Sequence, residues 1–175
     1  MNKNRIFEYK YTERCGFLTV TTNIRWKSLL INIAIPLAIG GVASLITNDG
    51  FKNYSDVVKP TLSPPSWVFP VVWTVLYVLM GISTYLIYEK DKELNKSSFI
   101  IYAVQLALNF FWPIVFFGFN AYFLAFIILL LLIVFVIAMI INFYRENHIA
   151  GLLQIPYLIW LIFAAYLNMA VFLLN

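Results

Sequence analysis

The sequence predicts an all-α integral membrane protein, built as a bundle of five transmembrane helices. Of its 175 residues, 62% are hydrophobic and only 11% are charged, whereas soluble domains carry roughly 25% charged residues. Five stretches contain no Asp, Glu, Lys or Arg, and each approaches or exceeds the ~20 residues that cross hydrocarbon as a helix. Aromatic residues make up 18% of the chain, and Trp and Tyr are typical of the boundary between lipid and water.

The five stretches are expected to be helical, because lipid offers the backbone no hydrogen-bond partners. They are too long, and too apolar on all faces, for the alternating strands of an outer-membrane barrel. The stretches are Ser28–Asn48, Ser66–Tyr88, Ser97–Gly118, Ala121–Tyr144 and Ile149–Asn175. The chain is therefore divided into a polar N-terminal tail, residues 1–28, and a transmembrane domain, residues 29–175.

The connections between the stretches are short, with one exception. Residues 118–120 barely allow a turn, which predicts a tight antiparallel pair of the third and fourth helices. Residues 145–147 are nearly as brief. The exception is Asp49–Pro65, which contains three prolines and is expected to be stiff and largely extended. A long, rigid loop among short ones is a candidate for function.

The first and third helices carry small residues along one or two faces. Such stripes allow helices to approach closely, either within the bundle or between two protomers. Packing within the chain is the favoured interpretation, and a homodimer is the alternative. The residues are Ala34, Ala38, Gly40, Gly41 and Ser44 in the first helix and Ala103 and Ala107 in the third.

The second helix opens with three aromatic residues, Trp67, Trp73 and Tyr77. We interpret them as anchors at the membrane interface.

The third and fifth helices each present aromatic, amide and small side chains along one face. Gln105 and Asn109 lie one helical turn apart, with Trp112 and Phe116 continuing nearly the same face. The matching stripe of the fifth helix consists of Trp160, Phe163, Ala164, Leu167 and Asn168. Two interpretations stay open. The stripes could line a pocket for a flat, mostly apolar ligand, or the amides could join helices at roughly 0.6–2 kcal/mol each.

The basic residues predict the orientation of the bundle. Ten of the 12 Lys and Arg residues lie in the tail, the second connection and the fourth connection, and only Lys52 and Lys59 lie on the opposite side. By the positive-inside rule the N-terminus is cytoplasmic, and the proline-rich loop and the C-terminus are outside. A bacterial cytoplasmic membrane fits this charge bias.

The sequence lacks the residues that several classes of function require. The net charge of +4 comes without a dense basic patch, so no nucleic-acid partner is expected. No charged residue lies inside a span, which argues against ion-coupled transport. Cys15 and His148 are the only residues of their types and lie outside the spans. No catalytic set and no metal site are expected.

Three blocks of sequence resemble the TspO/MBR family, which comprises the bacterial tryptophan-rich sensory proteins and the mitochondrial translocator protein, or peripheral benzodiazepine receptor. The first block is PPSWVFPVVWTVLYVLMG at residues 64–81. The second is QLALNFFWP at residues 105–113, followed by FFG at 116–118. The third is PYLIW at residues 156–160, followed by Phe163-Ala164 and Leu167-Asn168. The resemblance spans about residues 30–175.

The resemblance implies a five-helix bundle, often dimeric, whose pocket opens toward the first loop. It implies a porphyrin or haem-type tetrapyrrole as ligand, with no obligatory cofactor, and drug-like molecules of the benzodiazepine or isoquinoline type. Carried over by position, the ligand-binding candidates are Tyr54, Val72, Asn109, Trp112, Pro113, Phe116, Trp160, Phe163, Ala164 and Leu167.

The leading hypothesis is a membrane receptor or sensor that binds a tetrapyrrole between its helices. Light-dependent porphyrin degradation and passive transport of small apolar or anionic metabolites are the alternatives. Asn53 stands where many family members have the Trp implicated in degradation, which argues against that activity. Cholesterol binding is not expected, because residues 168–172 lack a basic residue after an aromatic one.

Overall fold

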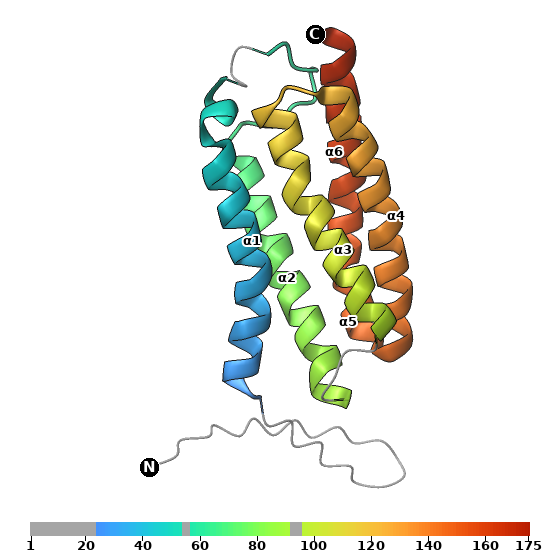
Figure 1. Cartoon of the computed structure of the whole chain (residues 1–175). Helices are drawn as coiled ribbons and strands as arrows, with labels where there is room; N and C mark the ends of the chain where they lie inside the picture. Colours follow the sequence, from blue (N-terminus) through green and yellow to red (C-terminus); the bar gives the residue numbers. More distant parts are fainter. Residues whose placement is uncertain (1–23, 54–56, 92–95) are drawn as a thin grey trace, which may run out of the picture.

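The computed structural model describes residues 24–53, 57–91 and 96–175, most of which are helical. Five helical segments are long and apolar enough to cross a membrane, and they lie side by side as one bundle (Figure 1). The prediction of an all-α bundle of five transmembrane helices is therefore confirmed, and the chain is an integral membrane protein.

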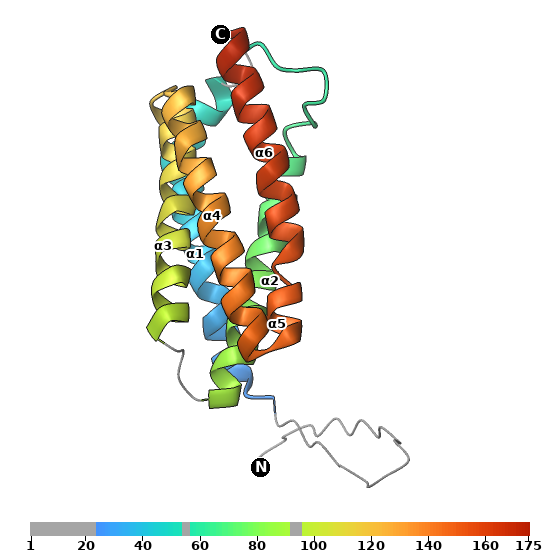
Figure 2. The same cartoon turned by 90° about the vertical axis from the view of Figure 1, so that its right-hand side faces the viewer.

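The elements follow one another along the chain with few residues between them. They are α1 (Trp26–Asn53), α2 (Val68–Asp91), α3 (Lys96–Pro113), the π-helical turn η2 (Ile114–Gly118), α4 (Tyr122–Glu146), α5 (His148–Leu152) and α6 (Ile155–Leu174). The start of α1 and the end of α2 lie at one end of the bundle, which we call the inner end; the end of α1 and the C-terminus lie at the other, the outer end (Figures 1 and 2).

Helix α4 shows why the bundle requires lipid. Leu129, Leu132 and Val136 are fully buried along one face, at the spacing of three or four residues that a helix repeats. On the opposite face Leu131 and Val134 are exposed. This exposed apolar surface would destabilise a protein in water, whereas hydrocarbon solvates it as well as a protein core does.

The last span is not one continuous helix, as Ile149–Asn175 was expected to be. It consists of α5 and α6, which are separated by a turn at Leu153 and Gln154. Pro156 explains the break, because it has no N–H to donate to the carbonyl four residues earlier. The side chain of Asn147 caps α5 by accepting hydrogen bonds from the backbone N–H groups of Ile149 and Ala150.

The end of the third span widens into the π-helical turn η2. Pro113 precedes it and again removes a donor from the regular helical pattern. The chain then reverses at Asn120, whose φ of 52° lies in the left-handed region that Asn tolerates. This confirms the predicted tight turn between antiparallel neighbours, since α4 begins at Tyr122.

Helix α1 is longer than expected and shortens the first loop. Residues 49–53, predicted to be extended, continue the helix. No proline lies between Asn48 and Pro60, so each residue of this added turn can donate its N–H to the carbonyl four residues earlier. The described part of the loop, residues 57–67, is irregular, as expected from its prolines. It is tied to α6 by Asn175, whose side-chain amide accepts from the N–H of Val58 at 3.1 Å and donates to its C=O at 3.1 Å.

The small residues have two different environments. Gly81 of α2 lies against the backbone of α1, where an added Cβ would come within 2.5 Å of Ile33 Cα. Close packing of this pair depends on the missing side chain. Ala103 and Ala107 are instead exposed and line an outer groove between α1 and α3. Their interpretation as packing residues within the chain is wrong, since none of the described helices covers them. The homodimer stays a prediction.

Replacement of Gly81 by Ala is expected to destabilise the bundle by about 1–3 kcal/mol, because the α1 backbone must move to admit the methyl group. The matched control is Gly41→Ala, since an added Cβ at Gly41 meets nothing within 4 Å. It should change the free energy of unfolding by less than about 0.5 kcal/mol. Unfolding by SDS titration in mixed micelles measures both, and equal stabilities of the two variants would contradict the close contact.

Candidate functional site

The inward face of α3 is polar along its whole length. Ser98, Tyr102, Gln105, Asn109 and Trp112 are all buried, and they recur every three or four residues so that they share one stripe. A buried polar group in hydrocarbon needs a partner, because leaving it unpaired costs several kcal/mol. Each of these side chains therefore has to be matched by another helix.

Asn109 is the centre of this match. Its Oδ1 accepts a hydrogen bond from the Tyr77 hydroxyl of α2 at 2.6 Å. Its Nδ2 donates to the Tyr157 hydroxyl of α6 at 2.6 Å. The Tyr157 hydroxyl in turn donates to Oε1 of Gln105 at 3.3 Å. One amide on α3 thus joins α2 and α6.

A second amide works in the same way nearer the outer end. Asn168 of α6 accepts from the Trp112 indole Nε1 at 3.1 Å and donates to the backbone C=O of Tyr122 at 2.7 Å. The amides do join helices, as one of the two interpretations of these stripes proposed. Asn109 and Asn168 each form hydrogen bonds with residues of other helices that are distant in sequence.

Trp73 packs at the middle of the aromatic side chains. Its ring centroid lies 5.6 Å from that of Tyr77, 6.1 Å from that of Trp112 and 6.1 Å from that of Tyr157. The interpretation of Trp73 and Tyr77 as interface anchors is therefore wrong, because both face the bundle interior, where Tyr77 is buried and Trp73 partly buried. Trp67 is 67% exposed, which suits an anchor.

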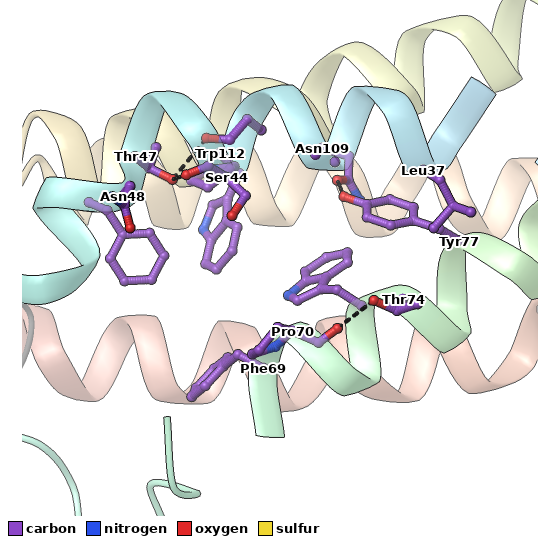
Figure 3. A pocket seen from close by; sticks show the side chains of 16 residues that line it. Leu37, Ser44, Thr47, Asn48, Phe69, Pro70, Thr74, Tyr77, Asn109 and Trp112 are labelled. Carbon is purple, nitrogen blue, oxygen red and sulfur yellow. Dashed lines mark hydrogen bonds between the residues drawn. The ribbon is translucent and has the colours of Figure 1, made fainter. Parts of the chain in front are cut away.

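A cavity of about 360 Å³ lies between α1, α2 and the end of α3. Figure 3 shows Ser44, Thr47 and Asn48 on one side of it and Phe69 and Thr74 on the other. The hydrogen bond between Tyr77 and Asn109 lies at one end. The lining residues are Leu37, Gly40, Gly41, Ala43, Ser44, Thr47, Asn48, Phe69, Pro70, Trp73, Thr74, Tyr77, Asn109, Trp112, Pro113 and Phe117.

The predicted ligand-binding residues fall into three groups. Asn109, Trp112 and Pro113 line the cavity. Phe116 is buried behind it, with its ring 5.6 Å from that of Trp112. Val72 is partly buried and packs against the core without lining the cavity.

The candidates on α6 do not line the cavity. Ala164 and Leu167 are buried in the core. The Trp160 ring contacts Phe69 at 5.9 Å and Phe163 at 5.6 Å, measured between centroids. Its Nε1 is buried without a hydrogen-bond partner. Tyr54 lies outside the described residues.

Sequence reasoning missed the wall that α1 contributes. Gly40, Gly41, Ala43, Ser44 and Thr47 all line the cavity. The stripe of small residues in α1 was the available signal, but it was interpreted as helix packing. In α1 the small residues serve both close packing and open space. Gly40 lies against the Tyr77 ring, whereas an added Cβ at Gly41 would meet nothing within 4 Å.

The chemistry of the cavity is that of a neutral site. None of its lining residues carries a charge, and its polar groups are amides and hydroxyls. Among the described residues no cluster of His, Cys, Asp and Glu could hold a metal ion. The walls offer aromatic faces for stacking and a few groups for hydrogen bonds, a combination that is typical of pockets for small, largely apolar molecules.

Known proteins resemble the chain over most of its length. Residues 32–174 match the model of the TspO/MBR family. The chain is 37% identical to the tryptophan-rich protein TspO of Archaeoglobus fulgidus, over 84% of this chain and 96% of that protein. It is 35% identical to the protein of the same name from Chlorobaculum tepidum, over 85% and 96%. Identity with the translocator protein of Ovis aries is 38%, over 70% and 75%.

Replacement of Asn109 by Leu is expected to destabilise the bundle by about 1–3 kcal/mol, because the buried hydroxyls of Tyr77 and Tyr157 lose a partner. Tyr77→Phe removes only one of the two bonds and should cost less, about 1 kcal/mol. The double variant should lose less than the sum of the two single losses, since both act on one bond. SDS titration in mixed micelles measures all three, and strictly additive losses would contradict the bridge.

Proposed function

The chain belongs to the TspO/MBR family, and we propose that it is a membrane receptor for a flat, mostly apolar molecule of the tetrapyrrole or drug-like class, bound in the cavity between α1, α2 and α3. One observation carries this proposal: the cavity is lined by some of the residues that the family resemblance implies as ligand-binding. Asn109, Trp112 and Pro113 belong to both sets.

The aromatic walls support a planar ligand. Trp73, Trp112 and Phe69 come from two helices and line the same space. Aromatic faces bind other rings by offset stacking or edge contacts, worth about 0.5–1.5 kcal/mol beyond the apolar area that they bury. A planar conjugated molecule would gain several such contacts at once.

The cavity size sets the pose of a larger ligand. At about 360 Å³, it lies at the small end of ligand pockets, which hold roughly 300–1,000 Å³. A molecule of two or three rings would fit inside. A tetrapyrrole is larger, so its edge would extend beyond the lining residues. Because those residues are uncharged, the carboxylates of a porphyrin would belong on the extending edge.

The orientation of the bundle follows from its basic residues. Arg25, Lys27, Lys96 and Arg145 all lie at the inner end, and Lys59 lies in the loop at the outer end. We place the inner end, with the N-terminus, in the cytoplasm and the outer end, with the C-terminus, outside. A bacterial cytoplasmic membrane is the proposed location.

Binding is tested by titrating the chain in detergent with protoporphyrin IX and following tryptophan fluorescence. Gly41→Leu should weaken binding by roughly tenfold, about 1.4 kcal/mol, because Gly41 lines the cavity and nothing within 4 Å of an added Cβ keeps the larger side chain out of it. Ala34→Leu is the matched control, since Ala34 is exposed on α1 and does not line the cavity.

Three outcomes distinguish the possible sites. Weaker binding in Gly41→Leu with unchanged binding in Ala34→Leu supports the cavity. Weaker binding in Ala164→Phe alone would move the site to the α6 stripe. Absence of saturable quenching in the unaltered chain would overturn the receptor proposal.

A further inference from the structure

Helices α1 and α2 touch closely at two glycines, one on each helix. Gly81 lies against the α1 backbone at Ile33, and Gly40 lies against the Tyr77 ring. At both points even a methyl group would have no room, since an added Cβ would come within 2.5 Å of Ile33 Cα and 2.1 Å of Tyr77 Cε2. We call the interface between α1 and α2 the seam; these two contacts close it at Ile33 and at Gly40.

Beyond Gly40 the edges of the same seam are exposed. Gly41, Ser44 and Asn48 of α1 line the cavity and are exposed at the same time. Pro70 and Thr74 of α2 share both properties. Each set recurs every three or four residues, so that each set forms one edge of its helix. The cavity therefore has a lateral mouth between these two edges.

Near its outer end α1 is held against the third span. Gly50 lies against the backbone of η2, where an added Cβ would come within 2.0 Å of the Phe117 carbonyl oxygen. Contacts at Gly40 and at Gly50 thus bracket the exposed edge of α1. The mouth lies along the side of the bundle, between these two contacts.

The depth of the mouth places it in hydrocarbon. The membrane-crossing part of α1 is Trp26–Gly50, and Ser44 follows its midpoint by six residues, or about 9 Å at 1.5 Å per residue. Half the thickness of the hydrocarbon core is about 15 Å. The hydroxyl of Ser44 therefore lies within the leaflet that contains the outer half of α1, while Asn48 lies near its boundary.

We propose that the ligand reaches the cavity sideways from this leaflet, through the mouth edged by Gly41, Ser44 and Asn48 on α1 and by Pro70 and Thr74 on α2. The inference rests on the proposed receptor function and adds to it the route by which the ligand enters. The ligand dissolves in the bilayer before it binds, and it carries polar atoms that the hydroxyls and the amide at the mouth can contact. A molecule confined to water does not reach the site by this route.

The test uses the full chain in lipid nanodiscs, with protoporphyrin IX delivered from protein-free vesicles and binding followed by stopped-flow fluorescence. Ser44→Phe and Thr74→Phe narrow the mouth. Their matched controls are Leu45→Phe and Val75→Phe, which place the same ring on the neighbouring residue. Leu45 and Val75 are exposed, at 80% and 53%, and neither lines the cavity.

A narrowed mouth should slow association and dissociation together, by roughly tenfold each, because both directions use one path. The two controls should keep the rates of the unaltered chain. Faster dissociation in Ser44→Phe and Thr74→Phe, or unchanged rates in both, would overturn the lateral route. Failure of protoporphyrin IX to bind the unaltered chain at equilibrium would instead overturn the receptor function, so the two failures are distinguishable.

Discussion

The hydrogen bonds of Asn109 are the interaction on which the rest of the bundle depends. Hydrocarbon gives apolar helices little reason to associate, because lipid tails solvate leucine as well as another helix does. A buried amide is different, since it must find partners or remain unpaired at high cost. Asn109 accepts from Tyr77 on α2 and donates to Tyr157 on α6, both at 2.6 Å. The relative positions of α2, α3 and α6 are thereby specified by polar groups at the centre of the membrane.

Helix α1 lies outside this polar network, and the cavity results from that. Its described side-chain hydrogen bonds at Asn32 and Thr47 go to its own backbone, and its contacts with neighbours include the glycines at positions 40, 50 and 81. These contacts hold α1 against α2 and η2, while the small residues between Gly40 and Gly50 leave space beside the aromatic side chains. Helices α2 and α3, joined by hydrogen bonds, thus supply the aromatic walls of the cavity. Helix α1 supplies the remaining wall, which is built largely from small residues.

The sequence was sufficient for the architecture, because the lack of charge over five long stretches permits only membrane-crossing helices. It also identified Asn109 and Trp112 from helical spacing. It could not decide which helices face each other. Trp73 and Tyr77 therefore looked like interface anchors, and Ala103 and Ala107 looked like packing residues. The break before Pro156 could not be predicted from the missing donor alone, because Pro36 lies inside α1 without ending that helix. Nor could the wall from α1, because small residues serve close packing and open space equally well.

The central claim is that the ligand site is bounded by α1, α2 and α3. Photo-crosslinking with a diazirine derivative of protoporphyrin, followed by mass-spectrometric mapping of the labelled residues, tests it most directly. Labels at residues 41–48 of α1 together with residues 109–113 of α3, displaced by unlabelled protoporphyrin, are the predicted result. Displaceable labels confined to residues 160–167 of α6 would contradict the account.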